Sequence, residues 1–163
     1  MKHLIGLDIG TTGVKGVLVT DRGRVLAAEF REYPLSLPKP GWAEQDPEHW
    51  WQATVASLRG LLATSGVSPK SIAGLSLSGQ MHGLVCLDGE DRVLRPAILW
   101  CDTRTTAQCR RIEEAVGGRP RLIQLACNPA LEGFTLPKLI WVREHEPEAV
   151  SYTHLTLPTI YSV

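Results

Sequence analysis

The stretch that decides the fold is Leu4 to Thr20, LIGLDIGTTGVKGVLVT, near the start of the chain. Two runs rich in Ile, Leu and Val flank a short segment of glycine and threonine, a pattern that predicts a β-hairpin with a polar tip. Asp21-Arg22-Gly23-Arg24 is a further turn signal, and Val25 to Tyr33 reads as a third strand. We therefore expect three consecutive antiparallel strands before any helix.

The tip of this hairpin carries residue types that bind phosphate. Gly10 and Gly13 allow positive φ and let an anion come close to bare backbone N–H groups. Thr11 and Thr12 add hydroxyl donors, and Lys15 adds a cation. The tip is therefore a candidate phosphate cradle.

Asp8, at the end of the first strand, is a candidate ligand for a hydrated magnesium ion, because Mg²⁺ prefers oxygen ligands and keeps several of its waters. The alternative is a turn that only reverses the chain, with Asp8 as turn chemistry. The spacing excludes a P-loop, which needs four residues between its first glycine and a Gly-Lys-Ser/Thr group.

Composition leaves room for one ordinary domain with a small-molecule partner. The chain has 163 residues, of which 44% are hydrophobic, enough to fill a single core. Its 17 basic and 17 acidic residues give a formal net charge of zero. The charge balance therefore indicates no nucleic acid and no anionic membrane as a partner.

The four cysteines, Cys86, Cys101, Cys109 and Cys127, form no CxxC pair and lack the spacing of a metal site. No signal peptide or long apolar span is visible. We expect a reduced, cytoplasmic setting in which the cysteines are small core residues.

A long helix is predicted after the irregular, proline-rich segment from Pro34 to Ala43. Asp46 and Pro47 stand in the usual order of an N-cap and a first helical residue, and Gly66 provides a stop. One apolar stripe along this helix should face the core. Its members are Trp51, Val55, Leu58 and Leu62.

Ser71 to Ser78 reads as a buried strand, and Leu84 to Asp88 as another. The segment SGQMHG between them places Gln80, Met81 and His82 at the carboxyl end of a strand, where ligands of α/β folds bind. The alternative is that the methionine fills a gap in the core and the histidine is a hydrogen-bonded turn residue.

A short apolar run ending at Trp100 leads into Cys101-Asp102-Thr103-Arg104. Asp102 could cap the helix that follows, which Gly117 and Gly118 end, or it could contact a ligand, and both roles can hold together. A last helix is expected from near Pro137 to before Pro147.

Five blocks of this sequence resemble the FGGY carbohydrate kinase family, a branch of the superfamily of sugar kinases, heat-shock chaperones and actin. The resemblance runs from the first strand to about Val150. The blocks are DIGTTGVKGVLVTDRGRV, GWAEQDPEHWW, SGQMHG, the group Trp100-x-Asp102-x-Arg104, and FTLPKLIWVREHEPE.

For the nucleotide, the resemblance implies ATP and Mg²⁺ as cofactors. Asp8 would hold the metal through water and so act as the catalytic, phosphate-positioning carboxylate. The backbone from Gly10 to Gly13, including Thr11 and Thr12, would meet the terminal phosphates, with Lys15 beside it.

For the sugar, family members that phosphorylate glycerol carry a Gln-Arg-Glu type segment where this chain has GQMHG, the version typical of members that phosphorylate xylulose. Met81 would pack on D-xylulose, and His82 would hydrogen-bond its hydroxyls. The expected sugar site also includes Gln80, Trp100, Asp102 and Arg104, and the block that begins at Phe134 would line the substrate side.

The implied fold is α/β, an incomplete ribonuclease-H-like amino-terminal domain over residues 1–150. Its mixed sheet of about five strands begins with three antiparallel ones and is flanked by helices. Residues 151–163 contain no Lys, Arg, Asp or Glu, and we expect them to be a cloning or reading-frame scar. The alternative is a genuine apolar strand.

The implied activity is transfer of the γ-phosphate of ATP to D-xylulose, giving D-xylulose 5-phosphate. Such kinases need a downstream Asp as general base, and the last Asp here is Asp102, so we expect an amino-terminal fragment that is inactive alone. The rivals are a kinase of another pentulose or polyol and a non-catalytic sugar-binding remnant. The resemblance leaves a homodimer of the full-length parent open.

Overall fold

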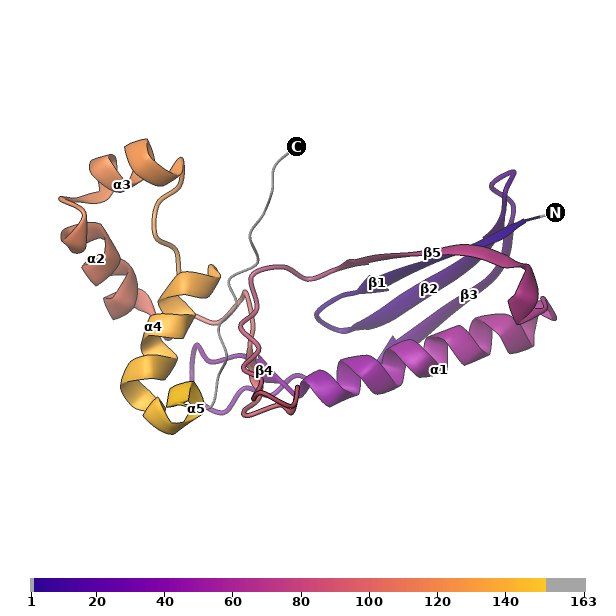
Figure 1. Cartoon of the computed structure of the whole chain (residues 1–163), viewed down its shortest axis with the longest axis horizontal. Coiled ribbons are helices and arrows are strands. Elements are labelled where there is room, and N and C mark those ends of the chain that lie inside the picture. The colour runs from indigo at the N-terminus through magenta and orange to yellow at the C-terminus, as the bar shows by residue number, and fades with distance from the viewer. Residues whose placement is uncertain (1, 152–163) are drawn as a thin grey trace.

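The computed structural model of the chain describes residues 2–151, so the expected tail, apart from Ser151, lies outside the described residues. Two parts lie end to end: a sheet with one long helix, and a cluster of shorter helices (Figure 1). The connections between these two parts bring the candidate site residues together.

The first three strands form an antiparallel meander, as predicted. They are β1 (His3–Ile9), β2 (Gly13–Thr20) and β3 (Val25–Glu32). β5 (Ile72–Gly79) pairs in parallel with β1, so the sheet is mixed and four-stranded, in the order β3-β2-β1-β5 (Figure 1). The strand expected at Leu84 to Asp88 does not form, because this segment makes only isolated bridges, at Leu84 and Leu87.

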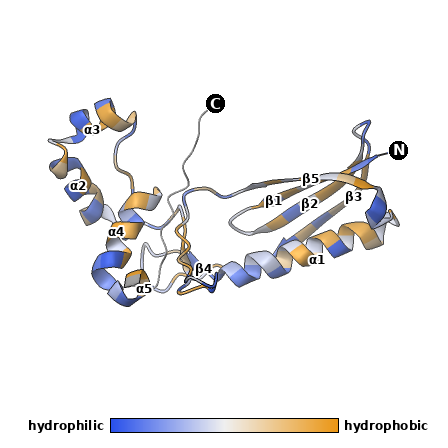
Figure 2. Cartoon of the chain, in the orientation of Figure 1, coloured by the Kyte–Doolittle hydropathy of each residue, from blue (hydrophilic) through white to orange (hydrophobic). Residues whose placement is uncertain are grey.

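α1 (Pro47–Ser65) covers one face of the sheet and is capped as the sequence predicts. The Asp46 carboxylate accepts a hydrogen bond of 2.9 Å from the Glu48 N–H, and Gly66 ends the helix with φ 66°. Figure 2 shows hydrophobic and hydrophilic residues interspersed along α1, the pattern of a helix with one covered face.

The predicted stripe of α1 is confirmed at Leu58 and Leu62, which pack against the core, and is wrong at Trp51. The buried residues are Ala53, Thr54, Ser57 and Leu61, whereas Trp51 is 64% exposed. A Cβ on Gly16 of β2 would lie 2.5 Å from the Ser57 hydroxyl oxygen, so the helix approaches the sheet closely on its small residues. Larger side chains such as Leu58 and Leu62 pack at the margin of the core.

β5 is an exposed edge strand rather than the buried strand expected. Leu75 and Leu77 are both exposed, because α1 packs on β2 and β3. The core beneath α1 comes from the meander and the helix. Its buried members are Ile5, Leu7, Val14, Leu18, Ala27, Tyr33, Ala53 and Leu61.

The second part begins with a short ladder between β4 (Glu44–Gln45) and β6 (Ala97–Ile98). Four helices follow: α2 (Thr106–Ala115), α3 (Arg119–Ala126), α4 (Thr135–His145) and α5 (Pro147–Ser151). A short 3₁₀ turn, Pro69–Ser71, precedes β5. A second core is built from Leu84, Cys86, Ile98, Trp141 and Val142.

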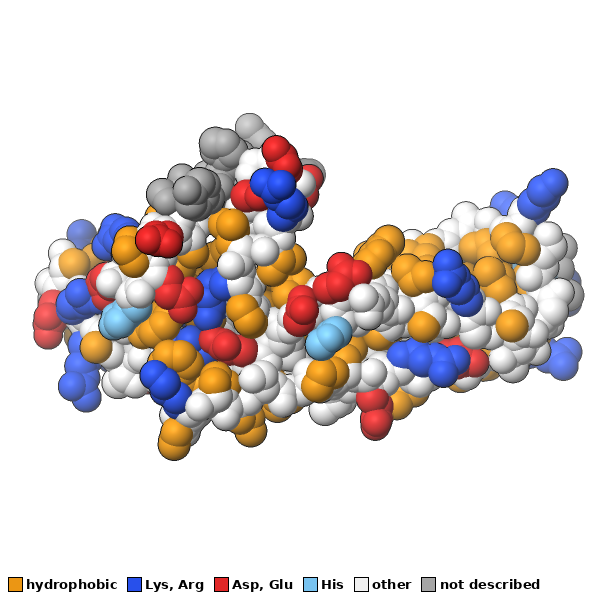
Figure 3. All heavy atoms as spheres, turned by 90° about the horizontal axis from the view of Figure 1, so that it is seen from below, with side chains coloured by type: hydrophobic (Ala, Val, Ile, Leu, Met, Phe, Trp, Pro, Cys, Tyr) orange, Lys and Arg blue, Asp and Glu red, His pale blue; other side chains and the backbone are white. Residues whose placement is uncertain are grey.

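The visible surface in Figure 3 carries basic and acidic side chains interspersed, without a large patch of one sign. Within residues 2–151 no helix combines the length and the apolar character that crossing a membrane requires.

Candidate functional site

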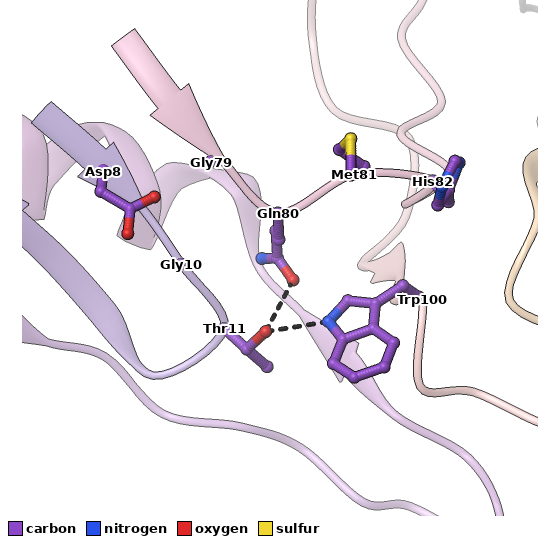
Figure 4. A pocket seen from close by; sticks show the side chains of 8 residues that line it. All are labelled: Asp8, Gly10, Thr11, Gly79, Gln80, Met81, His82 and Trp100. Atoms are coloured by element: carbon purple, nitrogen blue, oxygen red, sulfur yellow. Dashed lines mark hydrogen bonds between the residues drawn. The ribbon is translucent and has the colours of Figure 1, made fainter.

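A cavity of about 390 Å³ lies where three segments meet: the hairpin tip, the turn after β5 and the loop at Trp100. Seven predicted site residues line it, together with Gly79 (Figure 4). The seven are Asp8, Gly10, Thr11, Gln80, Met81, His82 and Trp100. The structure therefore brings most of the predicted phosphate and sugar residues into one hollow.

The hairpin tip is closed by a hydrogen bond of 3.0 Å from the Gly10 N–H to the Gly13 carbonyl. Neither glycine uses the positive φ that it allows, because the described glycines with positive φ lie elsewhere in the chain. Gly13 is needed for another reason. A Cβ there would lie 2.4 Å from the Arg31 carbonyl oxygen, so only glycine allows β3 to approach this closely.

Tyr33, directly after β3, is hydrogen-bonded to the hairpin tip. Its hydroxyl donates a short hydrogen bond to the Gly10 carbonyl. Burial raises the pKa of Tyr33 to about 12, and the negative charge of Asp8 adds to this effect. The phenol therefore stays protonated at neutral pH and remains a donor. Sequence reasoning did not single out this residue.

Thr11 joins the three segments that form the cavity (Figure 4). The Trp100 indole N–H donates to the Thr11 hydroxyl oxygen at 2.9 Å, and that hydroxyl donates to the side-chain oxygen of Gln80 at 3.3 Å. The hairpin tip, the turn after β5 and the loop at Trp100 are thereby held at fixed spacing.

Gln45 is a second junction that sequence reasoning missed, although the GWAEQ block contains it. Its side-chain amide donates to the Thr11 carbonyl at 2.7 Å and the Pro34 carbonyl at 3.3 Å. Its oxygen accepts from the Trp50 indole at 3.0 Å and the Gln80 amide at 3.1 Å. All the hydrogen-bonding capacity of a side chain that is only 2% exposed is used.

Met81 and His82 project from the turn after β5 on the side of Gln80 away from Asp8 (Figure 4). Met81 is 70% exposed, so the alternative that it fills a gap in the core is wrong. His82 has φ 64°, the left-handed region, and its ring lies edge-on to Phe134 at 4.9 Å. Both side chains are accessible to a ligand.

Asp102 and Arg104 do not line this cavity. Both are buried, and Arg104 pairs with the Asp102 carboxylate at 2.7 Å and with Glu44 at 2.8 Å. The guanidinium also lies 3.7 Å from the centre of the Trp42 ring. The geometry therefore favours scaffolding for this pair.

The capping alternative for Asp102 is wrong, because Thr105 is the N-cap residue of α2. The Asp102 carboxylate instead accepts from the Ala43 N–H at 2.7 Å and the Arg104 N–H at 2.9 Å. It thus fixes the segment that leads into β4.

Lys15 and Thr12 lie beside the cavity rather than in its lining. Lys15 is paired with Asp8 across β1 and β2, and both line a second hollow of about 280 Å³ with Ser76 and Ser78. Asp8 therefore belongs to both hollows. Thr12 is exposed, and its carbonyl accepts from the Tyr33 N–H at 3.4 Å.

The donor set around Asp8 fits a metal held mainly by water and phosphate. Its carboxylate is exposed, and within residues 2–151 no three acidic, histidine or cysteine side chains gather as a cage for a metal ion. Magnesium is bound in this way where substrate phosphates supply further ligands.

The FGGY family of carbohydrate kinases, N-terminal domain, matches residues 3–160. The chain belongs to this family. An FGGY relative, the xylulose kinase of Bacillus subtilis (strain 168), is 51% identical over 157 residues, which cover 96% of this chain and 31% of the relative.

Solved FGGY structures share the architecture. A "xyloylose kinase" from Brucella ovis has a TM-score of 0.87 and 39% identity, over 95% of this chain and 32% of that one. The xylulose kinase from Rhodospirillum rubrum has a TM-score of 0.86 and 32% identity, over 93% and 31%. The predicted fold is confirmed, and the chain spans about a third of the length of these relatives.

Proposed function

We propose that this chain is the amino-terminal part of an ATP-dependent kinase that phosphorylates D-xylulose to D-xylulose 5-phosphate. The observation that carries the proposal is the shared cavity, in which exposed Met81 and His82 lie with Asp8 and the hairpin tip. The identity of 51% to the Bacillus subtilis xylulose kinase supports the same substrate.

Each lining residue takes a part in holding the two substrates. Met81 and Trp100 offer apolar surface to the sugar, and His82 and Gln80 offer hydrogen bonds to its hydroxyls. The N–H groups of the tip, the Thr11 and Thr12 hydroxyls and Lys15 lie on the phosphate side. Asp8, which lines both hollows, would hold a hydrated Mg²⁺ beside the phosphates.

In the reaction, the 5-hydroxyl oxygen of the sugar bonds to the γ-phosphorus of ATP, the bond from that phosphorus to the bridging oxygen breaks, and ADP leaves. Bound Mg²⁺ neutralises charge on the phosphates. The proton of the hydroxyl goes to a general base, which we place in the part of the relatives that this chain does not span. The contribution of residues 2–151 to the reaction is then to position the sugar and the phosphates of ATP.

The four cysteines are free, which supports a reducing, cytoplasmic setting for the kinase. The expectation that they are core residues holds for Cys86 and Cys109 and is wrong for Cys101 and Cys127, which are exposed.

The proposal is tested with a chimera in which residues 1–150 replace the matching part of the Bacillus subtilis relative. We expect ATP-dependent phosphorylation of D-xylulose and none of glycerol in a coupled assay. Preference for another pentulose or polyol would refute the substrate assignment. Calorimetric titration of the 163-residue chain with D-xylulose shows whether its own cavity holds the sugar.

A further inference from the structure

A buried lysine contacts the backbone of His82, one of the proposed sugar-binding residues. Lys138, in the first turn of α4, is 0% exposed. Its ammonium group hydrogen-bonds to four backbone carbonyls: those of Glu132 at 2.9 Å, Phe134 at 3.0 Å, His82 at 3.3 Å and Gly133. Burying a cation is costly unless it is satisfied in this way.

These carbonyls come from two distant parts of the chain. Three belong to the loop that enters α4, and the fourth belongs to the turn after β5, 56 residues before Lys138. An ammonium group has three N–H donors to share among them. Lys138 therefore ties the His82 turn to the start of α4.

His82 needs such support because of its backbone conformation. Its φ of 64° is one that side chains with a Cβ adopt only where the surroundings impose it. Two further groups from the same block hold it. The Thr135 hydroxyl donates to the His82 carbonyl at 3.3 Å, and the Phe134 ring packs against the imidazole.

We propose that Lys138 is a positioning residue for sugar binding: by fixing the carbonyl of His82, it sets the direction in which the imidazole enters the cavity. The inference rests on the proposed function for its sugar. It also gives the FTLPK block a role outside the cavity lining. Phe134, Thr135 and Lys138 of this block hold His82, which lines the cavity.

The test uses Lys138→Met in the 163-residue chain, with Lys70→Met, at an exposed lysine, as the matched control. The main readout is the imidazole ¹³C–¹H NMR signal of His82, assigned with His82→Gln. We expect Lys138→Met to shift and broaden this signal, while the Trp50 indole signal, which reports its bond to Gln45, stays in place. Lys70→Met should leave both unchanged.

Thr135→Val keeps the test decisive if Lys138→Met does not fold, because this exposed residue donates to the same carbonyl. It should move the His82 signal in the same direction by less. An unmoved His82 signal in folded Lys138→Met, or in Thr135→Val where only that variant folds, would overturn the inference.

Titration with D-xylulose separates this inference from the proposed function. Lys138→Met should bind the sugar up to about tenfold more weakly than Lys70→Met, the scale of loss when the imidazole no longer hydrogen-bonds to a sugar hydroxyl. Equal affinity of the two variants would also overturn the inference. If the chimera does not phosphorylate D-xylulose, the proposed function is contradicted instead. The His82 signal then still tests whether Lys138 positions the imidazole.

Discussion

At the scale of single residues, the site depends on side chains whose own hydrogen bonds are complete. The Gln45 amide contacts the hairpin tip through Thr11 and the turn after β5 through Gln80. Because Gln45 is buried, removing its side chain would leave these partners without a hydrogen bond. The residues that line the cavity are thus held by a residue that does not line it.

Gln45→Leu should therefore lower the free energy of unfolding by about 2 kcal/mol, since buried polar groups lose their partner. Urea denaturation followed by tryptophan fluorescence measures this. Gln52→Leu is the matched control, because Gln52 is exposed and bonds only to Glu48 one turn away. Equal losses in the two variants would contradict the role of Gln45 as a junction.

His82→Ala and Asp8→Ala should separate the two substrates in the active chimera. The first should raise KM for D-xylulose about tenfold or more with little change in KM for ATP, because it removes hydrogen bonds to the sugar. The second should lower kcat through the metal and the phosphates. Steady-state kinetics with each substrate varied in turn measures both effects. If His82→Ala weakened only ATP binding, the assignment of His82 to the sugar would be wrong.

At the scale of elements, local signals predicted the fold better than the burial pattern did. The cap of α1 at Asp46 and its stop at Gly66 were predictable because each depends on one residue and its neighbours. The exposure of Trp51 was not predictable, because the face of α1 that packs on the sheet depends on Gly16 of β2, where the missing side chain lets the helix come close.

The residues of the candidate site also fall into those that local sequence signals could predict and those that they could not. The GQMHG turn and the hairpin tip could be placed from their position at strand ends. The burial of Asp102 and Arg104 could not, since it depends on Glu44 and Trp42, about 60 residues away along the chain. Gln45 and Lys138 escaped notice because two of the four partners of Gln45 and all four of Lys138 are backbone carbonyls, which sequence patterns do not reveal.

The α1 cap gives a prediction for this element alone. Asp46→Ala should cost about 1 kcal/mol of stability, because the Glu48 N–H loses its acceptor, whereas Asp46→Asn should be nearly neutral. Thermal unfolding by circular dichroism measures both. If Asn lowers Tm as much as Ala does, the carboxylate acts through its charge rather than as a cap.

At the scale of the whole molecule, a network of charges lies within the second part of the chain, beside the site. Arg104 lies against Trp42 and near Trp141 and pairs with Glu44, so it links β4 to α4. The cavity is bounded by elements from both parts, hence its shape depends on how they are held together.

Lys138 makes the stability of the folded chain depend on pH. Burial lowers its pKa from 10.5 to about 8, an effect that Asp102 partly opposes. Between these values the unfolded chain binds a proton that the folded chain has released, so stability due to this group rises with pH.

The free energy of unfolding of the native chain, relative to Lys138→Met, should therefore increase from pH 8 to pH 10.5. Urea titrations of both proteins across this range give the difference. The raised pKa values of Tyr33 and Cys86 lower stability at high pH, but they are present in both proteins and largely cancel. The charge of Lys138 lowers the pKa of Cys109, so its loss in Lys138→Met raises that pKa further and adds to the same increase. A difference that stays flat with pH would show that the lysine keeps its ordinary pKa.

The bridge made by Arg95 has a consequence for the order in which the protein forms during synthesis. Its guanidinium binds Glu44 at 2.7 Å and Glu146 at 2.6 Å, each 51 residues away along the chain. The meander and α1 pack on one another within the first 65 residues and can fold as they leave the ribosome, whereas this bridge waits until Glu146 has emerged. The hairpin tip is thus made early, and the ion-pair network beside the cavity is completed late.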